Sequence, residues 1–524
     1  MSYFPMSLSL ESKVMSTVSL VLVMVACSCA QPDRGFEYFF TDNDLEMDNI
    51  KLKFDREGYE TPSWVRGTYV RNGFGLFGVN KRKVLHIFDA LGKLTKLDFT
   101  NDGVFFSTKF IRSHLYNDSM SKHDIAPYLM FQGVDPDFNP LQKVEALLHG
   151  LDNMNINVHR YNKDYVVEND FWRLYQFDLE TLNVTRRYTP QVPNFGTMDN
   201  FFSLISSAHP LPEFGTQNLV SYVTTVEVGL QDYGHCVISL CRLPNVNDRE
   251  LISRWKLDRI PYMHSFAATK NYTVLFVGPL FVDITKLIRT VNPSHSLDWR
   301  GSDATEIFVT DIKSGFTKST KQMTGFTMHH INAFEENGRL IMDAVTYPNI
   351  DFLHSLQVSV LRNKTQRDAK IPSTSTLNRF ILDLHTMRLD VLEHNTTKGY
   401  EFLNRLDLPS INENFRYKPY CFVYGNVIKS DKVSVGNVTL VKKDLCNKGG
   451  DTVWSELNQY PSEAWFIPKP GSTVEDDGLL ISIVLDGYTK TSYLLHLDPK
   501  TMKTISRAYM PTFVPWTIHG RFFT

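Results

Sequence analysis

Apolar and polar residues alternate over short runs along most of the 524-residue chain, and clusters of turn-forming residues separate these runs. Alternation with a period of two is the pattern of a β-strand with one buried face. Helical spacing is scarce, and its clearest examples are residues 141–148 and 282–291. The pattern therefore predicts an all-β chain with two short helices.

One arrangement recurs along the chain: an apolar run that ends in a polar residue, then a turn, then a second run. The polar residues that end the first runs are Asp98, Asp178, Arg242, Asp311, Asp383, Asp444 and Asp498, with successive gaps of 80, 64, 69, 72, 61 and 54 residues. Seven hairpins at this spacing predict a seven-bladed β-propeller of four-stranded blades, with long insertions over one face. An eight-bladed propeller and a β-sandwich remain alternatives.

The N-terminal 30 residues differ in composition from the rest of the chain. No linker or low-complexity tract divides the remainder, so residues 31–524 are predicted to form a single domain. Residues 1–30 contain an apolar run that ends in Ser28-Cys29-Ala30, and such small residues suit signal-peptidase cleavage. They predict a cleaved signal peptide, with an uncleaved anchor as the alternative. A true signal implies the secretory pathway or the extracellular space; otherwise we expect a cytoplasmic protein, peripheral on membranes.

Charge and cysteine content narrow the class of protein. A net charge of −2 without a basic stripe gives no reason to expect a nucleic-acid partner. Beyond residue 30 the cysteines are Cys236, Cys241, Cys421 and Cys446. They could form two disulfides or remain four buried thiols, and none belongs to a Cys-x-x-Cys metal pair. Six Asn-x-Ser/Thr sequons, which are compatible with secretion, begin at Asn117, Asn183, Asn271, Asn363, Asn395 and Asn437.

The candidate chemistry lies in a few histidines at predicted strand ends. Asn337-Gly338 separates two apolar runs and predicts a hairpin, because both turn residues must accept a positive φ. The preceding strand carries His329 and His330 on opposite faces, so only one can face a given site. A single strand histidine is more often a core residue than a metal ligand. Three others occur beside apolar or small residues, each in a different predicted blade: His209, His264 and His519.

Several segments match one family in order. They are AHP (208–210), YMHSFA (262–267), MHHINAFEENG (328–338), YPSEAWF (460–466), EDDGLLISIV (475–484) and VPWTIHG (514–520). Over roughly residues 40–524 the chain resembles the carotenoid cleavage oxygenases, the group that includes the retinal-pigment-epithelium retinoid isomerase. The resemblance implies that the propeller has a cap of helices and loops over the face that bears an iron site.

By this resemblance, one non-haem Fe²⁺ per chain is bound by His209, His264, His329 and His519, with O2 as co-substrate. The family pattern His-x-x-Asn selects His329 over His330. No further catalytic residue is implied. Imidazole suits Fe(II), and four neutral nitrogens leave coordination positions open. The carboxylates expected to orient the ligands from outside are Glu168, Asp407 and Glu463. Asp407 stands where the family usually has glutamate, so its shorter side chain reaches its ligand through a backbone shift or a water, or holds it more loosely.

The implied activity is cleavage of a conjugated double bond of a carotenoid or apocarotenoid with O2, to give aldehyde or ketone products. Conversion of β-carotene to retinal is favoured among such reactions. The alternatives are a retinyl-ester isomerohydrolase that uses the same iron site, and a carotenoid-binding propeller without turnover. We expect an apolar polyene to enter from a membrane surface, and two apolar segments could form the entrance: residues 128–131 with the helix at 140–149, and residues 277–288. The alternative is that both segments are ordinary core elements or cap the propeller.

Overall fold

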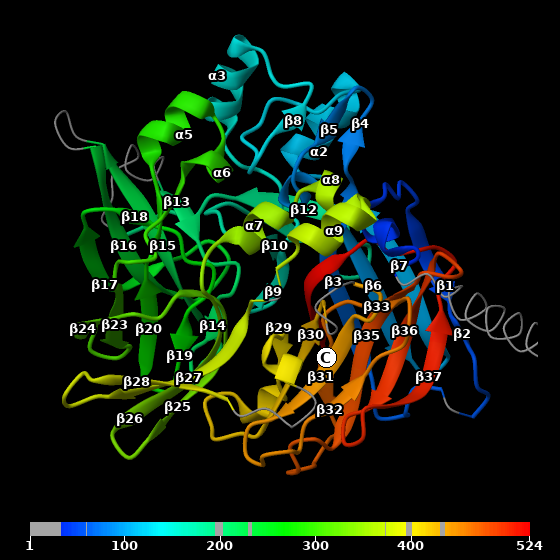
Figure 1. The fold of residues 1–524 in the computed structure, drawn as a ribbon. Helices are drawn as coiled ribbons and strands as arrows, with labels where there is room; N and C mark the ends of the chain where they lie inside the picture. Colours follow the sequence, from blue (N-terminus) through cyan, green and yellow to red (C-terminus); the bar gives the residue numbers. More distant parts are fainter. Residues whose placement is uncertain are drawn as a thin grey trace, which may run out of the picture.

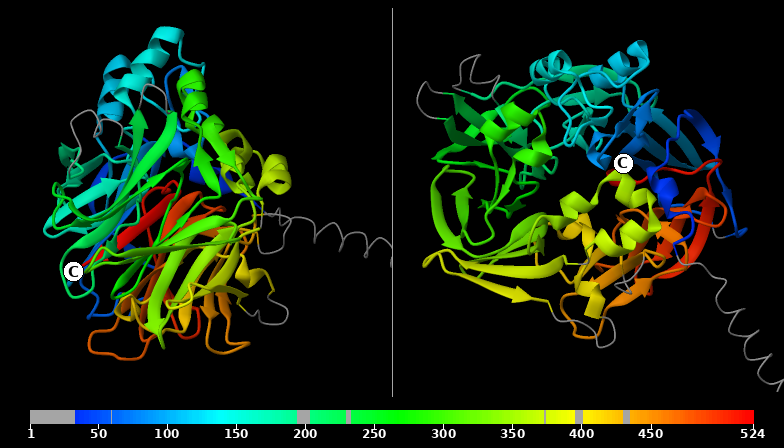
Figure 2. Two further views of the ribbon diagram at one scale, coloured as in Figure 1. Left: turned by 90° about the vertical axis from the view of Figure 1, so that its left-hand side faces the viewer. Right: turned by 45° about the horizontal axis from the view of Figure 1, so that its top comes forward.

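The computed structural model describes residues 33–58, 60–193, 203–228, 233–372, 374–394, 401–429 and 435–524. Its strands form seven sheets of four to six strands and two small sheets of three strands. The seven larger sheets follow one another around a ring in chain order, as Figures 1 and 2 show. The architecture is the predicted seven-bladed propeller, with one blade for each predicted hairpin.

The first four blades come from the N-terminal part of the chain, apart from one strand. From inside to outside, the first contains β38 (Thr517–Phe523), β3 (Gly67–Leu76), β6 (Leu91–Thr100), β7 (Gly103–Phe110) and β1 (Met47–Lys51). The second contains β9 (Asn157–Tyr161), β10 (Asp164–Glu168), β11 (Leu174–Phe177) and β12 (Val184–Tyr188). The third contains β13 (Ser203–Ser206) and β14 (Leu211–Pro212), which both pair with β15 (Leu219–Val228), then β16 (Tyr233–Leu243) and β17 (Glu250–Leu257). The fourth contains β19 (Ala267–Ala268), β20 (Tyr272–Val277), β23 (Thr305–Asp311) and β24 (Thr317–Gln322).

The remaining three blades complete the ring. The fifth contains β25 (Phe326–Glu336), β26 (Arg339–Tyr347), β27 (Thr376–Asp383) and β28 (Leu389–Glu393). The sixth contains β29 (Asp407–Ser410), β30 (Phe422–Val427), β31 (Thr439–Asp444) and β32 (Thr452–Trp454). The seventh contains β33 (Gln459–Pro461) and β34 (Trp465–Pro468), which pair with β35 (Gly478–Asp486), then β36 (Thr491–Asp498), β37 (Lys503–Tyr509) and β2 (Lys53–Phe54). Because β38 pairs with β3, the C-terminal strand closes the ring on the N-terminal blade.

The predicted Asn-Gly hairpin joins β25 to β26. Asn337 and Gly338 have φ values of 49° and 74°, and Glu336 pairs with Arg339 across the turn. Two positive φ angles in a two-residue loop match the right-handed twist of the flanking strands. This turn therefore fixes the pairing of β25 with β26 from Glu336 back to Asn332, three residues beyond His329.

Helices and short strands cap one face of the propeller, at the top of Figure 1. The helices are α2 (His114–Lys122), α3 (Pro140–His149), α5 (Ile284–Thr290), α6 (Pro293–Ser296), α7 (Asp351–Ser355), α8 (Val358–Arg362) and α9 (Lys364–Lys370). The small sheets are formed by β4 (Gly78–Val79), β5 (Arg82–Val84) and β8 (Val134–Asp135), and by β18 (Ile260–Pro261), β21 (Leu280–Val282) and β22 (Leu297–Trp299). Short 3-10 helices are η1 (Phe36–Phe40), η2 (Ile87–Asp89), η3 (Glu401–Asn404) and η4 (Glu413–Phe415).

Both helices predicted from the sequence are present as α3 and α5. The α3 helix begins after Asn139, whose side chain accepts from the backbone of Gln142 in a capping box. The α5 helix is shorter than the predicted 282–291, because Asp283 caps its first turn and Val291 has a left-handed conformation at its end. Their end signals, rather than the apolar spacing alone, set these boundaries.

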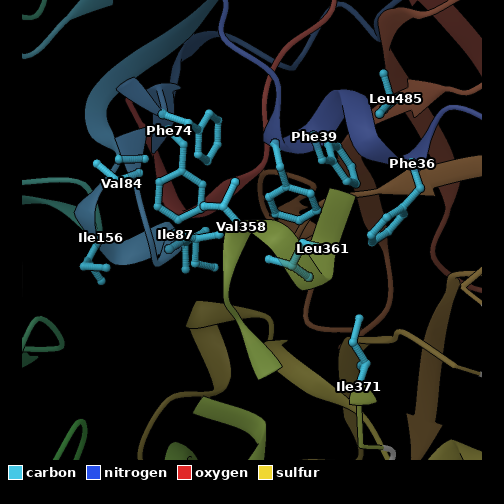
Figure 3. Close-up of a cluster of buried hydrophobic side chains, with 14 of the residues drawn as sticks. Phe36, Phe39, Phe74, Val84, Ile87, Ile156, Val358, Leu361, Ile371 and Leu485 are labelled. Carbon is cyan, nitrogen blue, oxygen red and sulfur yellow. The ribbon is translucent and has the colours of Figure 1, made fainter. Parts of the chain in front are cut away.

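A large apolar cluster joins the cap to the propeller (Figure 3). Phe36 and Phe39 of η1 pack with Val358 and Leu361 of α8 and with Phe74 of β3. Burial of side chains of this size contributes about 1.5–3 kcal/mol each. The N-terminal η1 helix therefore holds the cap in place over the blades.

The structure also resolves the open question about the cysteines. Cys421 and Cys446 form a disulfide, whereas Cys236 and Cys241 are buried thiols.

Residues 1–30, on which the predicted signal peptide falls, lie outside the described residues, as does Asn395. Within the described ranges, every helix is too short or too polar to cross a bilayer.

Candidate metal centre

Four blades each contribute one histidine to the centre of the propeller. His519 lies on β38 and His329 on β25, while His209 follows β13 and His264 lies just before β19. These are the innermost strands of the first, fifth, third and fourth blades. Because inner strands meet at the propeller axis, residues up to 310 positions apart in the chain become neighbours (519 − 209 = 310). The four predicted histidines are thus brought together.

The Nε2 atoms of the four rings converge. His264 Nε2 lies 2.9 Å from His209 Nε2 and 3.2 Å from His329 Nε2, and His329 Nε2 lies 3.3 Å from His519 Nε2. All four potential ligand atoms lie within 4.8 Å of one another. Two nitrogens bound at right angles to one metal, at about 2.1 Å each, are about 3 Å apart. The observed spacing matches that of ligands around one ion.

Three of the histidines are oriented by carboxylates on their other ring nitrogen. The Nδ1 atoms of His264, His329 and His519 lie 2.7, 2.6 and 2.8 Å from Asp170, Asp407 and Glu463, respectively. Each Nδ1–H therefore donates to a carboxylate, and each Nε2 presents a lone pair. The short contacts of His329 with the other two rings are accordingly lone pair to lone pair, an arrangement that a cation at the centre stabilises. The donor set of four imidazole nitrogens fits a divalent metal ion such as Fe(II).

At neutral pH, two of the four histidines are in the neutral form that binds a metal. Burial and the neighbouring histidines lower the pKa of His209 well below its ordinary value. Burial lowers the pKa of His519 to about 4. For His329, burial is outweighed by the Asp407 carboxylate, and its pKa is raised. Neutral imidazole is the form that binds a metal, so His209 and His519 are ready to bind without losing a proton.

One predicted carboxylate lies elsewhere, and Asp170 occupies its place. Glu168 does not contact any of the four histidines in the described structure; its Oε2 atom accepts from the hydroxyl of Tyr161 at 3.0 Å. Burial raises the pKa of Glu168 to about 8, so this side chain is largely protonated at pH 7. Residues two apart on an extended segment project to the same side, so the pattern alone could not separate Glu168 from Asp170. Asp407 and Glu463 lie where the sequence predicted, and Asp407 reaches His329 directly, without an intervening water.

His330 points away from the cluster, as predicted for the neighbour of a strand histidine. Its Nδ1 atom lies 2.8 Å from Ser265 Oγ, and its ring packs against Phe276 at 5.0 Å. Burial lowers the pKa of His330 to about 3. The β25–β26 register shifts on both sides of the histidine pair, between 327 and 329 and between 330 and 332. These β-bulges set the direction in which His329 points.

An apolar cavity of about 510 Å³ extends from the histidines into the cap. His264, His329 and His519 lie at its inner end, and Leu148 of α3 and Ile288 of α5 belong to its wall near the surface. Its aromatic lining consists of Phe88, Phe131, Phe171, Trp172, Tyr262, Tyr347, Phe352 and Trp516. A long apolar ligand can therefore lie against the metal centre while shielded from water.

Sequence reasoning missed three side chains that bind the orienting carboxylates. The hydroxyl of Tyr262 donates to Asp170 at 2.7 Å, and that of Tyr347 donates to Asp407 at 2.6 Å. Arg71 forms a buried ion pair with Glu463. For Tyr262 a signal existed, because it lies two residues before His264 in an extended segment and so shares its side. No local pattern links Tyr347 or Arg71 to the site.

Sequence comparisons place the chain beside one family of proteins. The family model described as retinal pigment epithelial membrane protein matches residues 41–524. The chain is 25% identical over 508 residues to the β,β-carotene 15,15'-dioxygenase of Rattus norvegicus, across 88% of this chain and 87% of that protein. It is 27% identical over 519 residues to the mitochondrial carotenoid-cleaving dioxygenase of Macaca fascicularis, across 88% of this chain and 90% of that protein.

Solved structures match the fold over nearly the whole chain. A variant of the Synechocystis apocarotenoid oxygenase superposes with a TM-score of 0.77 at 20% identity, and covers 94% of this chain and 100% of its own. The cobalt-substituted form of that oxygenase superposes with a TM-score of 0.75 at 20% identity, over 94% of this chain and 98% of its own. At this identity the likeness establishes the shared propeller fold.

Proposed function

Since the chain belongs to the retinal pigment epithelial membrane protein family, we propose that it cleaves one conjugated double bond of a carotenoid or apocarotenoid with O2. The observation that carries this proposal is the apolar cavity that ends at the cluster of four imidazoles, three of which line it. A cavity with this lining selects a long hydrocarbon, and the imidazoles hold the metal. The products are two carbonyl compounds, aldehydes or ketones according to the substitution of the double bond.

The chain's own residues bind and orient the substrate. Bound Fe(II) supplies the activation of O2, and His209, His264, His329 and His519 would hold it. Aromatic faces along the cavity, such as those of Tyr347 and Phe352, shield positive character that develops in a polyene. The apolar wall excludes water from the reacting double bond. No side chain is required to move a proton, and among the described residues at the cavity's inner end the carboxylates are already bound to the ligand histidines.

The preferred substrate within this proposal is β-carotene, with retinal as the product. Support comes from the similarity to a β,β-carotene 15,15'-dioxygenase over 88% of this chain. The mitochondrial carotenoid-cleaving dioxygenase of Macaca fascicularis is similar over the same 88% of this chain, at 27% identity. Within this proposal, the double bond that is cleaved is set by how deep each end of the polyene lies in the cavity.

The test is incubation of the Fe(II)-loaded protein with β-carotene in detergent micelles, with and without O2, followed by mass identification of the products. We expect retinal, formed only with O2. A longer apocarotenal as product would support the oxygenase activity but at a different double bond. Absence of any cleavage of β-carotene and of apocarotenals would contradict the proposal, and O2-independent release of a retinol isomer from a retinyl ester would favour the isomerohydrolase instead.

We further propose that the substrate enters from a membrane surface between α3 and α5. Leu141, Val144 and Leu148 of α3 are 82, 57 and 67% exposed, and Ile288 of α5 is 59% exposed. Leu148 and Ile288 also line the cavity, so the exposed apolar residues surround its outer end. Large apolar side chains exposed together are typical of a membrane or partner contact.

Vesicle binding tests this entrance. We expect Leu141→Asp combined with Val144→Asp to reduce sedimentation with phosphatidylcholine vesicles several-fold, while turnover of detergent-solubilised substrate stays near wild type. The matched control is Val391→Asp combined with Leu392→Asp on the outer strand β28, where two large apolar residues are also exposed. Equal vesicle binding by all three proteins would contradict the proposal.

We also propose that the protein enters the secretory pathway. The Cys421–Cys446 disulfide suits an oxidising compartment, and Asn117, Asn183, Asn271 and Asn363 are exposed sequon residues. Expression in animal cells followed by N-glycosidase treatment checks this. We expect a shift to lower mass on treatment. If the protein shows neither a mass shift nor a disulfide, the result would contradict the proposal and favour the cytoplasm.

A further inference from the structure

Two of the three carboxylates that orient the ligand histidines are aspartates, and each is bound by a tyrosine hydroxyl. Asp170 Oδ2 accepts from both His264 Nδ1 and Tyr262, each at 2.7 Å. Asp407 Oδ1 accepts from His329 Nδ1 at 2.6 Å, while its Oδ2 accepts from Tyr347 at 2.6 Å. The third carboxylate, Glu463, has an arginine instead of a tyrosine as its second donor.

The tyrosines saturate carboxylate oxygens that otherwise face an apolar cavity. Asp170 Oδ1 also accepts from the backbone N–H of Ala208 at 3.1 Å, and Asp407 Oδ1 from that of Leu408 at 2.8 Å. Tyr347 is the one donor to Asp407 Oδ2 among the described residues, whereas Tyr262 is a second donor to Asp170 Oδ2, beside His264 Nδ1. A carboxylate oxygen that faces an apolar cavity without a donor is costly, so loss of the Tyr347 hydroxyl would free Asp407 Oδ2 to turn away, and loss of the Tyr262 hydroxyl would leave Asp170 Oδ2 with His264 alone. The hydroxyls therefore keep each aspartate on the Nδ1 side of its histidine.

The same tyrosines belong to one row of stacked rings along the cavity. Tyr347 stacks on Phe352 with ring centroids 3.9 Å apart, Phe352 stacks on Phe326 at 6.1 Å, and Phe326 stacks on Tyr262 at 6.2 Å. Tyr262, Tyr347 and Phe352 line the cavity itself. The row connects the two aspartates through packed aromatic side chains, so the cavity wall and the metal ligands are positioned together.

We propose that Tyr262 and Tyr347 are positioning residues that fix His264 and His329 through Asp170 and Asp407, and thereby retain the metal. The hydroxyl supplies the second anchor that a short aspartate needs to hold one orientation. This inference rests on the metal site of the proposed function but not on its substrate. A wrong substrate assignment would leave the metal measurements below unchanged.

The chain offers a matched control away from the metal. Tyr420 donates to Asp343 at 2.8 Å, and His394 Nε2 contacts the same carboxylate at 2.8 Å. Tyr420→Phe therefore removes the same kind of buried hydroxyl from the same kind of Tyr–Asp–His group. Any loss of metal that follows from general destabilisation should appear in this variant as well.

The experiment measures the rate at which Fe(II) passes from the loaded full-length protein to a chelator, for Tyr262→Phe, Tyr347→Phe and Tyr420→Phe. We expect about 10-fold to 100-fold faster loss from the first two and the wild-type rate from the third. The visible bands of the Co(II)-substituted protein should shift in the first two and stay unchanged in the third, a signature that a purely structural role does not produce. Wild-type rates and bands in both Tyr262→Phe and Tyr347→Phe, or equal acceleration in Tyr420→Phe, would overturn the proposal.

Discussion

Asp407, which is half-buried, and Asp343, which is fully buried, are two aspartates with the same kinds of partners and different roles. Each binds a tyrosine hydroxyl and a histidine nitrogen at 2.6–2.8 Å. Asp343 also receives two hydrogen bonds from Arg379, at 2.9 and 2.8 Å, whereas Asp407 has no arginine among its recorded donors in the described structure. Asp343 is thus part of a neutralised ion pair, and Asp407 directs its charge toward a histidine.

The histidines of the two groups also differ in orientation. His329 uses Nδ1 for Asp407 and presents Nε2 to three other histidines, while His394 uses Nε2 for Asp343. Among the described residues, one group of three or more potential metal ligands is found, and it consists of the four histidines at the propeller axis. A carboxylate–histidine pair is therefore not enough for a metal site. Convergence of several blades supplies the remaining ligands.

The largest expected difference in iron binding is between removal of His329 and removal of His394. His329→Ala deletes one of four ligands, so we expect complete loss of iron binding and of turnover. His394→Ala removes a hydrogen bond to an already neutralised carboxylate and should cost about 1–3 kcal/mol of stability with full iron content. Metal analysis of the two purified variants checks this, and iron retained at one per chain in His329→Ala would break the comparison.

A smaller contrast is expected from neutralising each aspartate. Asp407→Asn weakens the orientation of His329, and we expect iron affinity to fall about 10-fold to 100-fold with a small change in melting temperature. Asp343→Asn leaves Arg379 without its carboxylate and should destabilise the fold by about 3 kcal/mol with unchanged iron affinity. Chelator competition and thermal melts separate the two effects. Loss of iron affinity in Asp343→Asn would show that the two groups are not distinct.

The smallest effect concerns acid stability. Burial alone would raise the pKa of Asp343, but hydrogen bonds from His394 and Arg379 hold it below its ordinary value of 3.8. The stability that this carboxylate contributes is therefore fully present above about pH 4 and is lost as the pH falls through the lower folded-state pKa. We expect Asp343→Asn to flatten the dependence of unfolding free energy on pH below 4. Denaturant melts at pH 3–7 give the slopes, and parallel curves for variant and wild type would contradict this.

The propeller and the candidate histidines could be predicted from the sequence because both depend on local patterns, and the family resemblance singles out the four as a ligand set. Alternation and Asn337-Gly338 specify strands and a turn, and a histidine at the end of an inner strand points to the axis once seven blades are recognised. The partners of those histidines depend on three-dimensional convergence. Tyr347 meets Asp407 from 60 residues away, and no periodicity predicts that contact. The family resemblance points to Glu168, but Asp170, two residues further along the same extended segment, is the carboxylate that contacts His264.

The most direct measurement for the central claim is X-ray absorption spectroscopy of the iron-loaded protein, combined with total metal analysis. We expect one iron per chain and outer-shell scattering from four imidazole rings, with no protein carboxylate among the ligands. Fewer than four imidazoles, or a carboxylate bound to the metal in their place, would contradict the account of a site built by four blades.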